Sequence, residues 1–128
     1  MTTTNDVAET LRSLNSDESV TLILRGGVEL VGTVEDSPEY VPPTTVTKKQ
    51  AQIPGGLSVR INLNSDSWSD LPSRHVSAYV EERSPGQWDD AKASVWRPIY
   101  ADESNSAIVD DEFESIGEIV EVEVGNSL

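Results

Sequence analysis

The chain has 128 residues and a formal net charge of −14, with 23 acidic residues against 9 basic residues. This length predicts a single domain, residues 1–128. Cysteine is absent, which excludes disulfides, thiolate metal sites and cysteine nucleophiles. No apolar run approaches the roughly 18 residues of a membrane-spanning helix, and the polar N-terminus has no signal-peptide pattern. We therefore expect a cytoplasmic protein that has no membrane partner.

The N-terminal segment predicts a short tail followed by a helix. Residues 1–5 are polar and are expected to fray. Asp6 is a suitable N-cap for a helix over residues 6–15, and apolar side chains recur along one face of that helix at Val7, Leu11 and Leu14. Because so short a helix is unstable alone, we expect its apolar face to pack on a β core.

Residues 20–34 carry the clearest structural signal, which is that of a β-hairpin. Apolar and polar residues alternate on both sides of a Gly-Gly pair, the pattern of two strands joined by a tight turn. A three-residue loop would pair Leu22 with Leu30 and gather the apolar rows on one face, with Gly27 in a left-handed conformation. Gly32, inside the second strand, predicts a bend or a close backbone approach.

Residues 36–56 are expected to form a long loop, because prolines and a glycine pair recur along them. A loop of this length in a small domain is unusual. It contains Lys48 and Lys49, the only adjacent basic residues. Two interpretations stay open: a solvated, mobile loop, or a contact arm for an acidic partner.

The remaining chain predicts further strands. Alternating apolar residues place them at 57–63, 75–82, 92–100 and 118–124. Pro98 makes the third of these an edge or bulged strand, and residues 101–115 form a polar, acidic connection. The predicted fold is therefore mainly β: a small antiparallel barrel of about five to six strands with a short N-terminal helix. A sandwich of two sheets is the alternative architecture.

The hairpin also carries a family resemblance. A helix, a short link and the hairpin follow one another, and the apolar and glycine positions are Val20, Leu22, Leu24, Gly27, Leu30, Gly32 and Val34. This arrangement resembles the first motif of the Sm-like proteins, which are small, strongly bent barrels that assemble into rings and bind RNA. The resemblance implies an SH3- or Sm-like barrel.

Departures from the Sm-like pattern concern its RNA-binding residues. Pro38 stands where the family places an aspartate, and the family's asparagine has no match. The family's second motif contains an arginine, whereas the nearest stretch, residues 116–120, contains none. The resemblance therefore extends to the fold and leaves the RNA-binding residues unassigned.

The negative charge is concentrated in the second half of the chain. Residues 65–128 carry 15 acidic and 4 basic residues, and only three lysines occur in the whole sequence. Such self-repulsion opposes compaction at ordinary ionic strength, whereas in molar salt the Debye length falls to about 3 Å. The composition resembles that of haloarchaeal proteins, which implies a halophilic cytoplasm. The alternative is an ordinary acidic interaction domain.

No residues are predicted to be catalytic, to bind a cofactor or to bind a metal. His75 is the single histidine, and no serine lies in a G-x-S-x-G context. The acidic groups Asp89-Asp90 and Asp110-Asp111-Glu112 lack the glycine-centred pattern of a calcium loop, which favours a solvated acidic face. A metal-dependent enzyme that uses acidic residues is the least favoured function.

A candidate binding surface combines basic and aromatic residues, the types that bind single-stranded nucleic acid. Its members are Lys48, Lys49, Arg60, Trp68, Arg74, Trp96 and Arg97. Alternatively, the tryptophans cover the ends of the core and the arginines pair with surface acids. The favoured function is a non-enzymatic binding or assembly module whose partner is another protein or a second copy. An Sm-like RNA-binding protein with a diverged base pocket is the alternative.

Overall fold

The computed structural model describes residues 4–46, 51–68, 71–102 and 105–125. They form a mainly antiparallel β structure with an N-terminal helix and one further helical turn. The elements are α1 (Thr4–Arg12), β1 (Ser19–Leu24), β2 (Glu29–Val34), β3 (Glu39–Val41), β4 (Thr44–Val46), β5 (Ala51–Ile53), β6 (Gly55–Leu63), α2 (Ser65–Trp68), β7 (His75–Ser84), β8 (Gln87–Trp88), β9 (Ala91–Asp102) and β10 (Asn105–Val124).

Eight strands form one sheet in the order β3-β6-β2-β1-β10-β9-β7-β8. Strand β6 also pairs with β7, so six strands form a closed circuit of pairings: β6, β2, β1, β10, β9 and β7. The prediction of five to six strands is wrong, because β3 and β8 add pairs to this sheet. These two strands span only three and two residues, too few for an alternating pattern to mark them.

The predicted hairpin is confirmed in its register. Leu22 is the Cα partner of Leu30, and the N–H of Leu24 donates to the carbonyl of Val28 at 2.8 Å, which leaves three residues in the loop. Gly27 has φ +93°, a conformation that favours glycine. At Gly32, a Cβ atom would lie 2.5 Å from the backbone oxygen of Asn62, so the predicted close approach is real.

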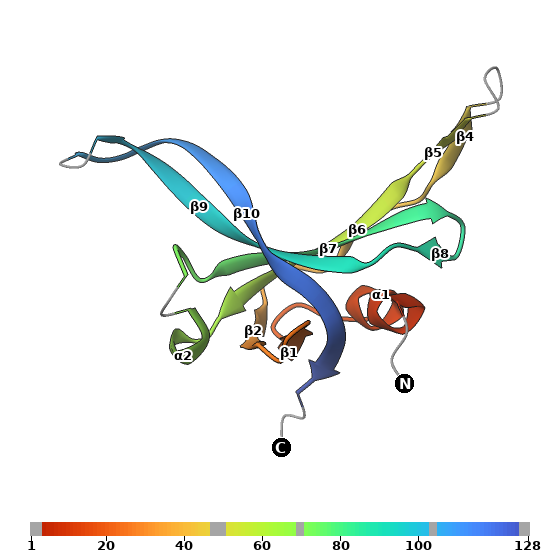
Figure 1. The fold of residues 1–128 in the computed structure, drawn as a ribbon, viewed down its shortest axis with the longest axis horizontal. Coiled ribbons are helices and arrows are strands. Elements are labelled where there is room, and N and C mark those ends of the chain that lie inside the picture. The colour runs from red at the N-terminus through yellow and green to blue at the C-terminus, as the bar shows by residue number, and fades with distance from the viewer. Residues whose placement is uncertain (1–3, 47–50, 69–70, 103–104, 126–128) are drawn as a thin grey trace.

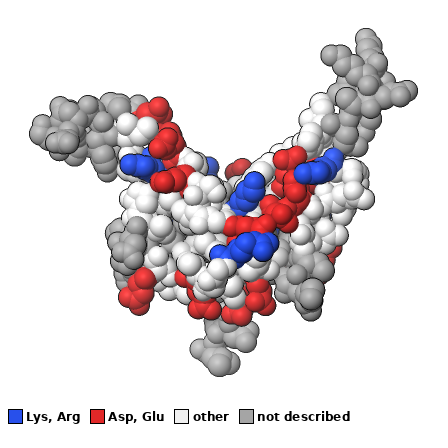
Figure 2. Space-filling view, in the orientation of Figure 1, with Lys and Arg blue, Asp and Glu red and all other residues white. Residues whose placement is uncertain are grey.

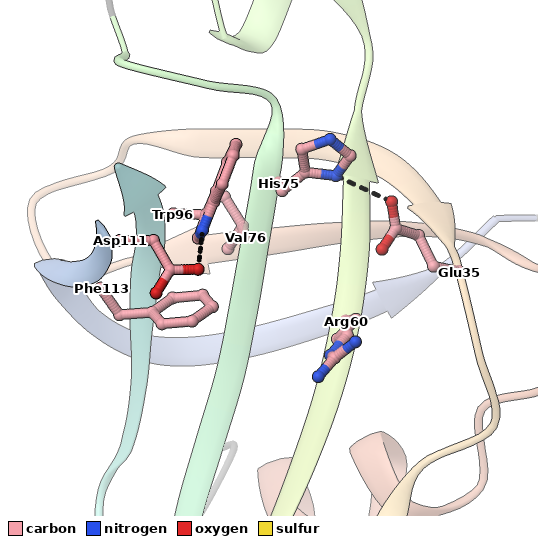
Figure 3. A pocket seen from close by; sticks show the side chains of 7 residues that line it. All are labelled: Glu35, Arg60, His75, Val76, Trp96, Asp111 and Phe113. Carbon is pink, nitrogen blue, oxygen red and sulfur yellow. Dashed lines mark hydrogen bonds and ion pairs between the residues drawn. The ribbon is translucent and has the colours of Figure 1, made fainter. Parts of the chain in front are cut away.

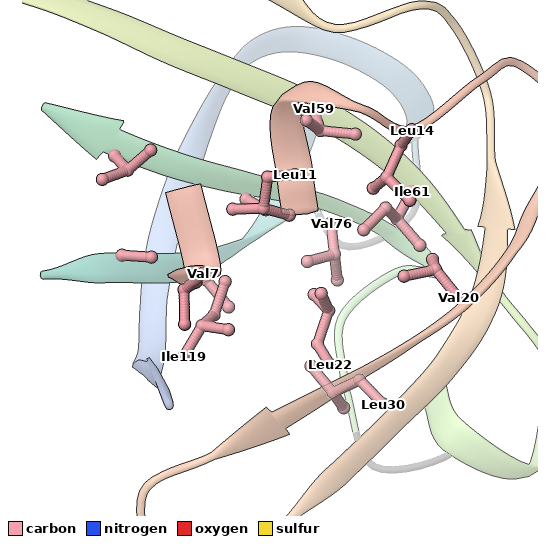
Figure 4. Close-up of a cluster of buried hydrophobic side chains, with 14 of the residues drawn as sticks. Val7, Leu11, Leu14, Val20, Leu22, Leu30, Val59, Ile61, Val76 and Ile119 are labelled. Atoms are coloured by element: carbon pink, nitrogen blue, oxygen red, sulfur yellow. The ribbon is translucent and has the colours of Figure 1, made fainter. Parts of the chain in front are cut away.

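One continuous core lies between α1 and the inner face of the sheet (Figure 4). The alternating residues of β6 and β7 are buried there, as predicted, at Leu57, Val59, Ile61, Leu63, Val76, Ala78 and Val80. The helix contributes Val7 and Leu11, with Leu14 just beyond it, and all three are at most 3% exposed. The predicted packing of the helix on the β core is therefore confirmed.

The helix bounds differ from those predicted. Helix α1 begins at Thr4 and ends at Arg12, so Asp6 lies in the first turn and is not the N-cap. The predicted fraying is wrong for Thr4 and Asn5, and residues 1–3 lie outside the described part. Contacts with residues from later in the sequence hold this first turn in place: the hydroxyl of Thr4 donates to Oδ1 of Asp90 at 3.2 Å.

Two ribbons project from the body on opposite sides (Figure 1). One is the β4–β5 pair, which with β3 and the start of β6 occupies most of residues 36–56. The other, here called the β9–β10 arm, consists of the part of β9 from Pro98 onward and the part of β10 up to Phe113, which pair with each other. Both the long loop and the acidic connection over residues 101–115 are therefore wrong predictions. A ribbon exposed on both faces needs no apolar alternation, so its strands resemble loops in sequence.

The prediction of an edge at Pro98 is confirmed. Strand β9 pairs with β7 only as far as Val95, and in the described residues its continuation through Pro98 pairs with β10 alone. Proline lacks an N–H and is tolerated where one side of a strand is unpaired. The arm therefore leaves the body as a ribbon with open edges.

Candidate binding site at the base of the β9–β10 arm

A row of outward-facing side chains crosses four strands of the sheet. Their neighbours Ile61, Val76 and Val95 are buried, and successive residues in a strand point to opposite faces. The row consists of Asn62 on β6, His75 on β7, Trp96 on β9 and Phe113 on β10. Asn62 is the Cα partner of His75, and Trp96 is that of Phe113. Strand register thus gathers residues that are far apart in sequence.

A cavity of about 320 Å³ opens on this face at the base of the arm (Figure 3). It is lined by Glu35, Arg60, His75, Val76, Trp96, Asp111 and Phe113. The rings of His75 and Trp96 meet edge to face, with centroids 5.9 Å apart. Phe113 is 54% exposed, a large apolar surface for a residue on an acidic strand. The cavity, here called the arm pocket, is therefore an aromatic site at the surface.

Hydrogen bonds hold the two nitrogen-bearing rings of the arm pocket in place. The indole Nε1–H of Trp96 donates to Oδ2 of Asp111 at 2.8 Å. Nδ1 of His75 lies 2.9 Å from Oε1 of Glu35, and the backbone N–H of Glu35 is fixed on the carbonyl of Arg60 at 2.9 Å. The pocket is thus preformed, with a carboxylate on each of two sides.

The charge of the arm pocket is slightly negative. Two carboxylates, Glu35 and Asp111, face one guanidinium, that of Arg60. Figure 3 shows Arg60 and Glu35 on the side of the pocket opposite Asp111. The exposed acids Asp110, Glu112 and Glu114 alternate with Asp111 and Phe113 along the same strand, so they point to the opposite face of the arm. The acidic groups of the pocket itself are therefore Glu35 and Asp111.

Most arginines elsewhere in the described residues are paired with acids. Arg25 pairs with Glu118, and Arg83 with Asp89 at 2.9 Å. The hydrogen bond from Arg83 lowers the pKa of Asp89, and the same bond raises the pKa of Arg83. On the face that Figure 2 shows, basic side chains lie beside acidic ones, without a continuous basic stripe among the described residues. The fold offers no broad cationic surface there.

The structure places the sequence-predicted binding residues in different parts of the surface. The structure brings Arg60 and Trp96 together in the arm pocket. Arg97 lies on the opposite face of β9, with its guanidinium 3.6 Å from Glu114. Arg74 is exposed just before β7, and its carbonyl accepts from Leu63.

The other predicted residues fall partly or wholly outside the described part. Trp68 ends α2, but its side chain is not among those described, and Lys48 and Lys49 lie outside the described residues. The alternative to a binding surface has two parts. Its pairing of arginines with surface acids is seen for Arg97, as it is for Arg83. Its covering of the core by tryptophan is seen for Trp88, which packs against the core.

Besides Val76, whose place in the strand pattern predicts a core residue, four residues of the arm pocket are not among the predicted binding residues: Glu35, His75, Asp111 and Phe113. In the sequence, His75 suggests only a catalytic group, and Asp111 only a metal ligand or a solvated face. Phe113 is the single phenylalanine of the chain and stands within an acidic run. That isolated aromatic residue is the one signal that could have drawn attention to the arm.

A second, smaller hollow of about 260 Å³ lies at the base of the β4–β5 ribbon. It is lined by Glu39, Val41, Pro54, Gly55, Gly56, Ser58 and Tyr79. Ser58 and Tyr79 are Cα partners on β6 and β7, and they point to the same face as Arg60 and His75 by alternation. The hydroxyl of Ser58 lies 3.2 Å from that of Ser77, which lies between the two hollows. The outer face of β6 and β7 therefore has a hollow at each end.

No protein-family model, curated protein or solved structure matches this chain. Within the described residues, no group of three or more histidine, aspartate or glutamate side chains is arranged to hold a metal ion. The described helices are also too short or too polar to cross a membrane.

Proposed function

We propose that this protein is a non-enzymatic binding module that takes an extended segment of a partner protein on the outer face of β6 and β7. The observation that carries the proposal is the arm pocket, in which Trp96, Phe113 and Arg60 line one surface cavity. Tryptophan, tyrosine, phenylalanine and arginine are enriched at protein interfaces. Exposed aromatic rings set beside a preformed cavity provide an anchor for a partner side chain.

The shape of the outer face supports an extended ligand. The two hollows lie at opposite ends of the paired β6–β7 segment. Between them lies Ser77, beside the exposed Arg60, and its hydroxyl lies 3.2 Å from that of Ser58 in the second hollow. This stretch of the surface can therefore form hydrogen bonds. An extended chain presents alternate side chains at regular intervals, which suits two separated hollows.

The closed circuit of strand pairings supports the architecture that we propose for this module. Six strands whose pairings close into a circuit, here through β6 and β7, have the connectivity of a barrel. Together with the N-terminal helix and the bent hairpin, this connectivity supports a small SH3- or Sm-like barrel. The two projecting ribbons and the extra short strands are then additions to that body.

RNA is the second candidate ligand, because Trp96 and Phe113 offer rings for base stacking beside Arg60. The carboxylates of Glu35 and Asp111 line the same cavity and would repel phosphates. This charge distribution favours a protein partner. We place the module in a halophilic cytoplasm, where screening would reduce the self-repulsion of a chain with net charge −14.

A peptide-display selection in molar potassium chloride tests this function. We expect random extended peptides to be enriched on the intact protein, and Phe113→Ala to abolish their capture. Val28→Ala is the matched control, because Val28 is also 54% exposed but lies just before β2 and is not among the residues that line the arm pocket. Failure to enrich any peptide beyond the Phe113→Ala background would overturn the proposal. Oligouridine that binds through Trp96 while no peptide binds would favour RNA.

A further inference from the structure

We propose that the arm pocket takes a cationic side chain, lysine or arginine, from the partner segment. This inference rests on the proposed function and names the chemistry that the pocket would recognise. Two observations lead to it: the two carboxylates and the aromatic rings that line the same cavity.

The carboxylates lie on opposite sides of the arm pocket and are held in position. Asp111 is fixed by the indole N–H of Trp96, and Glu35 by contact with His75. An ionised carboxylate has two oxygens and about four lone-pair sites, so one such bond leaves capacity for a ligand N–H. Charge-assisted hydrogen bonds are the stronger kind. An ammonium or guanidinium in the cavity could therefore reach a preset acceptor.

The aromatic rings favour the same ligand. Trp96 and Phe113 line the cavity beside Asp111, and a cation within about 6 Å of a ring centroid is attracted by the ring face. This chain already contains such a contact, since the guanidinium of Arg12 lies 4.2 Å over the ring of Tyr40. The methylene stem of lysine or arginine would pack on the rings while its charge faces the carboxylates.

The effect of removing Arg60 on binding depends on the charge of the ligand. Arg60 is the one guanidinium among the lining residues, which also include two carboxylates. An anionic ligand would use Arg60, so its loss would weaken binding. A cationic ligand is repelled by Arg60, so its loss would strengthen binding. The effect of Arg60→Gln therefore distinguishes a basic ligand from an acidic peptide or RNA.

The charge of the chain favours a basic partner segment over a second copy. Each copy has a formal net charge of −14, so two copies would bring like charges together, which costs binding free energy. A segment that carries lysine or arginine would instead be complementary to the two carboxylates of the pocket.

The test uses three blocked peptides, Ser-Thr-X-Thr-Ser, in which X is lysine, norleucine or glutamate. Binding to the intact protein is followed by the NMR signal of the Trp96 indole N–H, which is assigned with Trp96→Phe. We expect the lysine peptide alone to give a saturable shift. We expect Asp111→Asn to weaken its binding about fivefold, because the asparagine oxygen keeps the bond to Trp96 but the negative charge is lost. Glu29→Gln is the control, since it removes an exposed carboxylate on β2.

The decisive variant is Arg60→Gln, which we expect to tighten binding of the lysine peptide about twofold or more. Two results would overturn the cationic ligand but leave the peptide-binding module standing. One is that the intact protein binds the norleucine or glutamate peptide more tightly than the lysine peptide. The other is that Arg60→Gln binds the lysine peptide more weakly than the native protein does. If none of the three peptides shifts the signal, the cationic ligand is overturned. If the peptide-display selection also enriches no peptide, the proposed peptide-binding function is overturned as well.

Discussion

The hydroxyl of Tyr40 donates a hydrogen bond to Oε1 of Glu82, a carboxylate that is 3% exposed. Oε2 of the same carboxylate accepts from the N–H of Gly86 at 3.0 Å. Tyr40 also packs against Trp88, with ring centroids 5.9 Å apart, and lies under Arg12. Glu82 is the one charged residue buried in the described part of the chain. This small cluster therefore joins the short strand β3 to α1 and to the β7–β8 turn.

Removing the Tyr40 hydroxyl tests whether that bond contributes to stability. Tyr40→Phe leaves Glu82 buried with one donor fewer, and we expect the free energy of unfolding to fall. Chemical denaturation in molar salt measures the change. Tyr79→Phe is the control, since Tyr79 is 45% exposed and should lose little. Equal effects of the two substitutions would show that the Glu82 contact adds no stability.

The same bond predicts a loss of stability at alkaline pH. The hydrogen bond to Glu82 raises the pKa of Tyr40 above its usual value of 10.0, because it favours the protonated hydroxyl. In the unfolded chain the hydroxyl ionises near 10.0, so the contribution is present below that pH and is lost as pH rises through the folded value. The stability difference between the native protein and Tyr40→Phe should therefore shrink above pH 10.0. A difference that stays constant or grows would contradict this assignment.

Much of the body could be predicted from the sequence, because its strands have one buried and one exposed face. The register of Leu22 against Leu30 followed from that alternation, and so did the buried rows of β6 and β7. The arms could not be predicted in the same way. In the described part of the β9–β10 arm, Glu112 and Phe113 are neighbours on β10 and both are exposed, so both faces contact solvent there. The sequence pattern therefore marks Pro98 as an edge but predicts a polar connection beyond it.

The arm pocket could be predicted only in part, for a related reason. Arg60 and Trp96 have side chains typical of binding sites, and their types alone singled them out. Glu35 and Asp111 are single acids among 23 in the chain, and nothing local distinguishes them. They become lining residues because β2 ends beside β6 and because β10 folds back along β9. Such pairings are long-range, and a single sequence does not specify them.

Gly32→Ala tests the close approach of β2 and β6. The added Cβ would meet the backbone oxygen of Asn62 at 2.5 Å, and a backbone atom cannot move aside as a flexible side chain can. We expect the free energy of unfolding to fall by about 1–3 kcal/mol, as in other overpacked sites. Val31→Ala, at a neighbouring exposed position, serves as the control. A Gly32→Ala protein as stable as the native one would mean that the two strands lie farther apart.

Leu11→Ala tests the docking of α1 on the sheet. Leu11 is fully buried, and truncating such a leucine typically costs about 2–5 kcal/mol. The exposed Glu9, on the same helix, provides the control as Glu9→Ala, which changes helix propensity little. Denaturant midpoints of the two variants should differ clearly. Similar midpoints would show that the helix adds little to the stability of the core.

Salt should stabilise this protein through the acids that have no arginine beside them. Glu121 and Glu123 are both exposed on β10, in a half of the chain with 15 acids and 4 bases. Raising the salt from 0.1 M to 1 M shortens the Debye length from about 10 Å to about 3 Å, so we expect the thermal midpoint to rise in molar potassium chloride.

Salt can also strengthen apolar burial, and a charge variant separates the two effects. If screening is the cause, Glu121→Gln with Glu123→Gln should raise the midpoint in dilute buffer and reduce its dependence on salt. The same cooperative melt at both salt concentrations would remove the physical basis for a halophilic setting, because the folded chain would then tolerate its charge unaided.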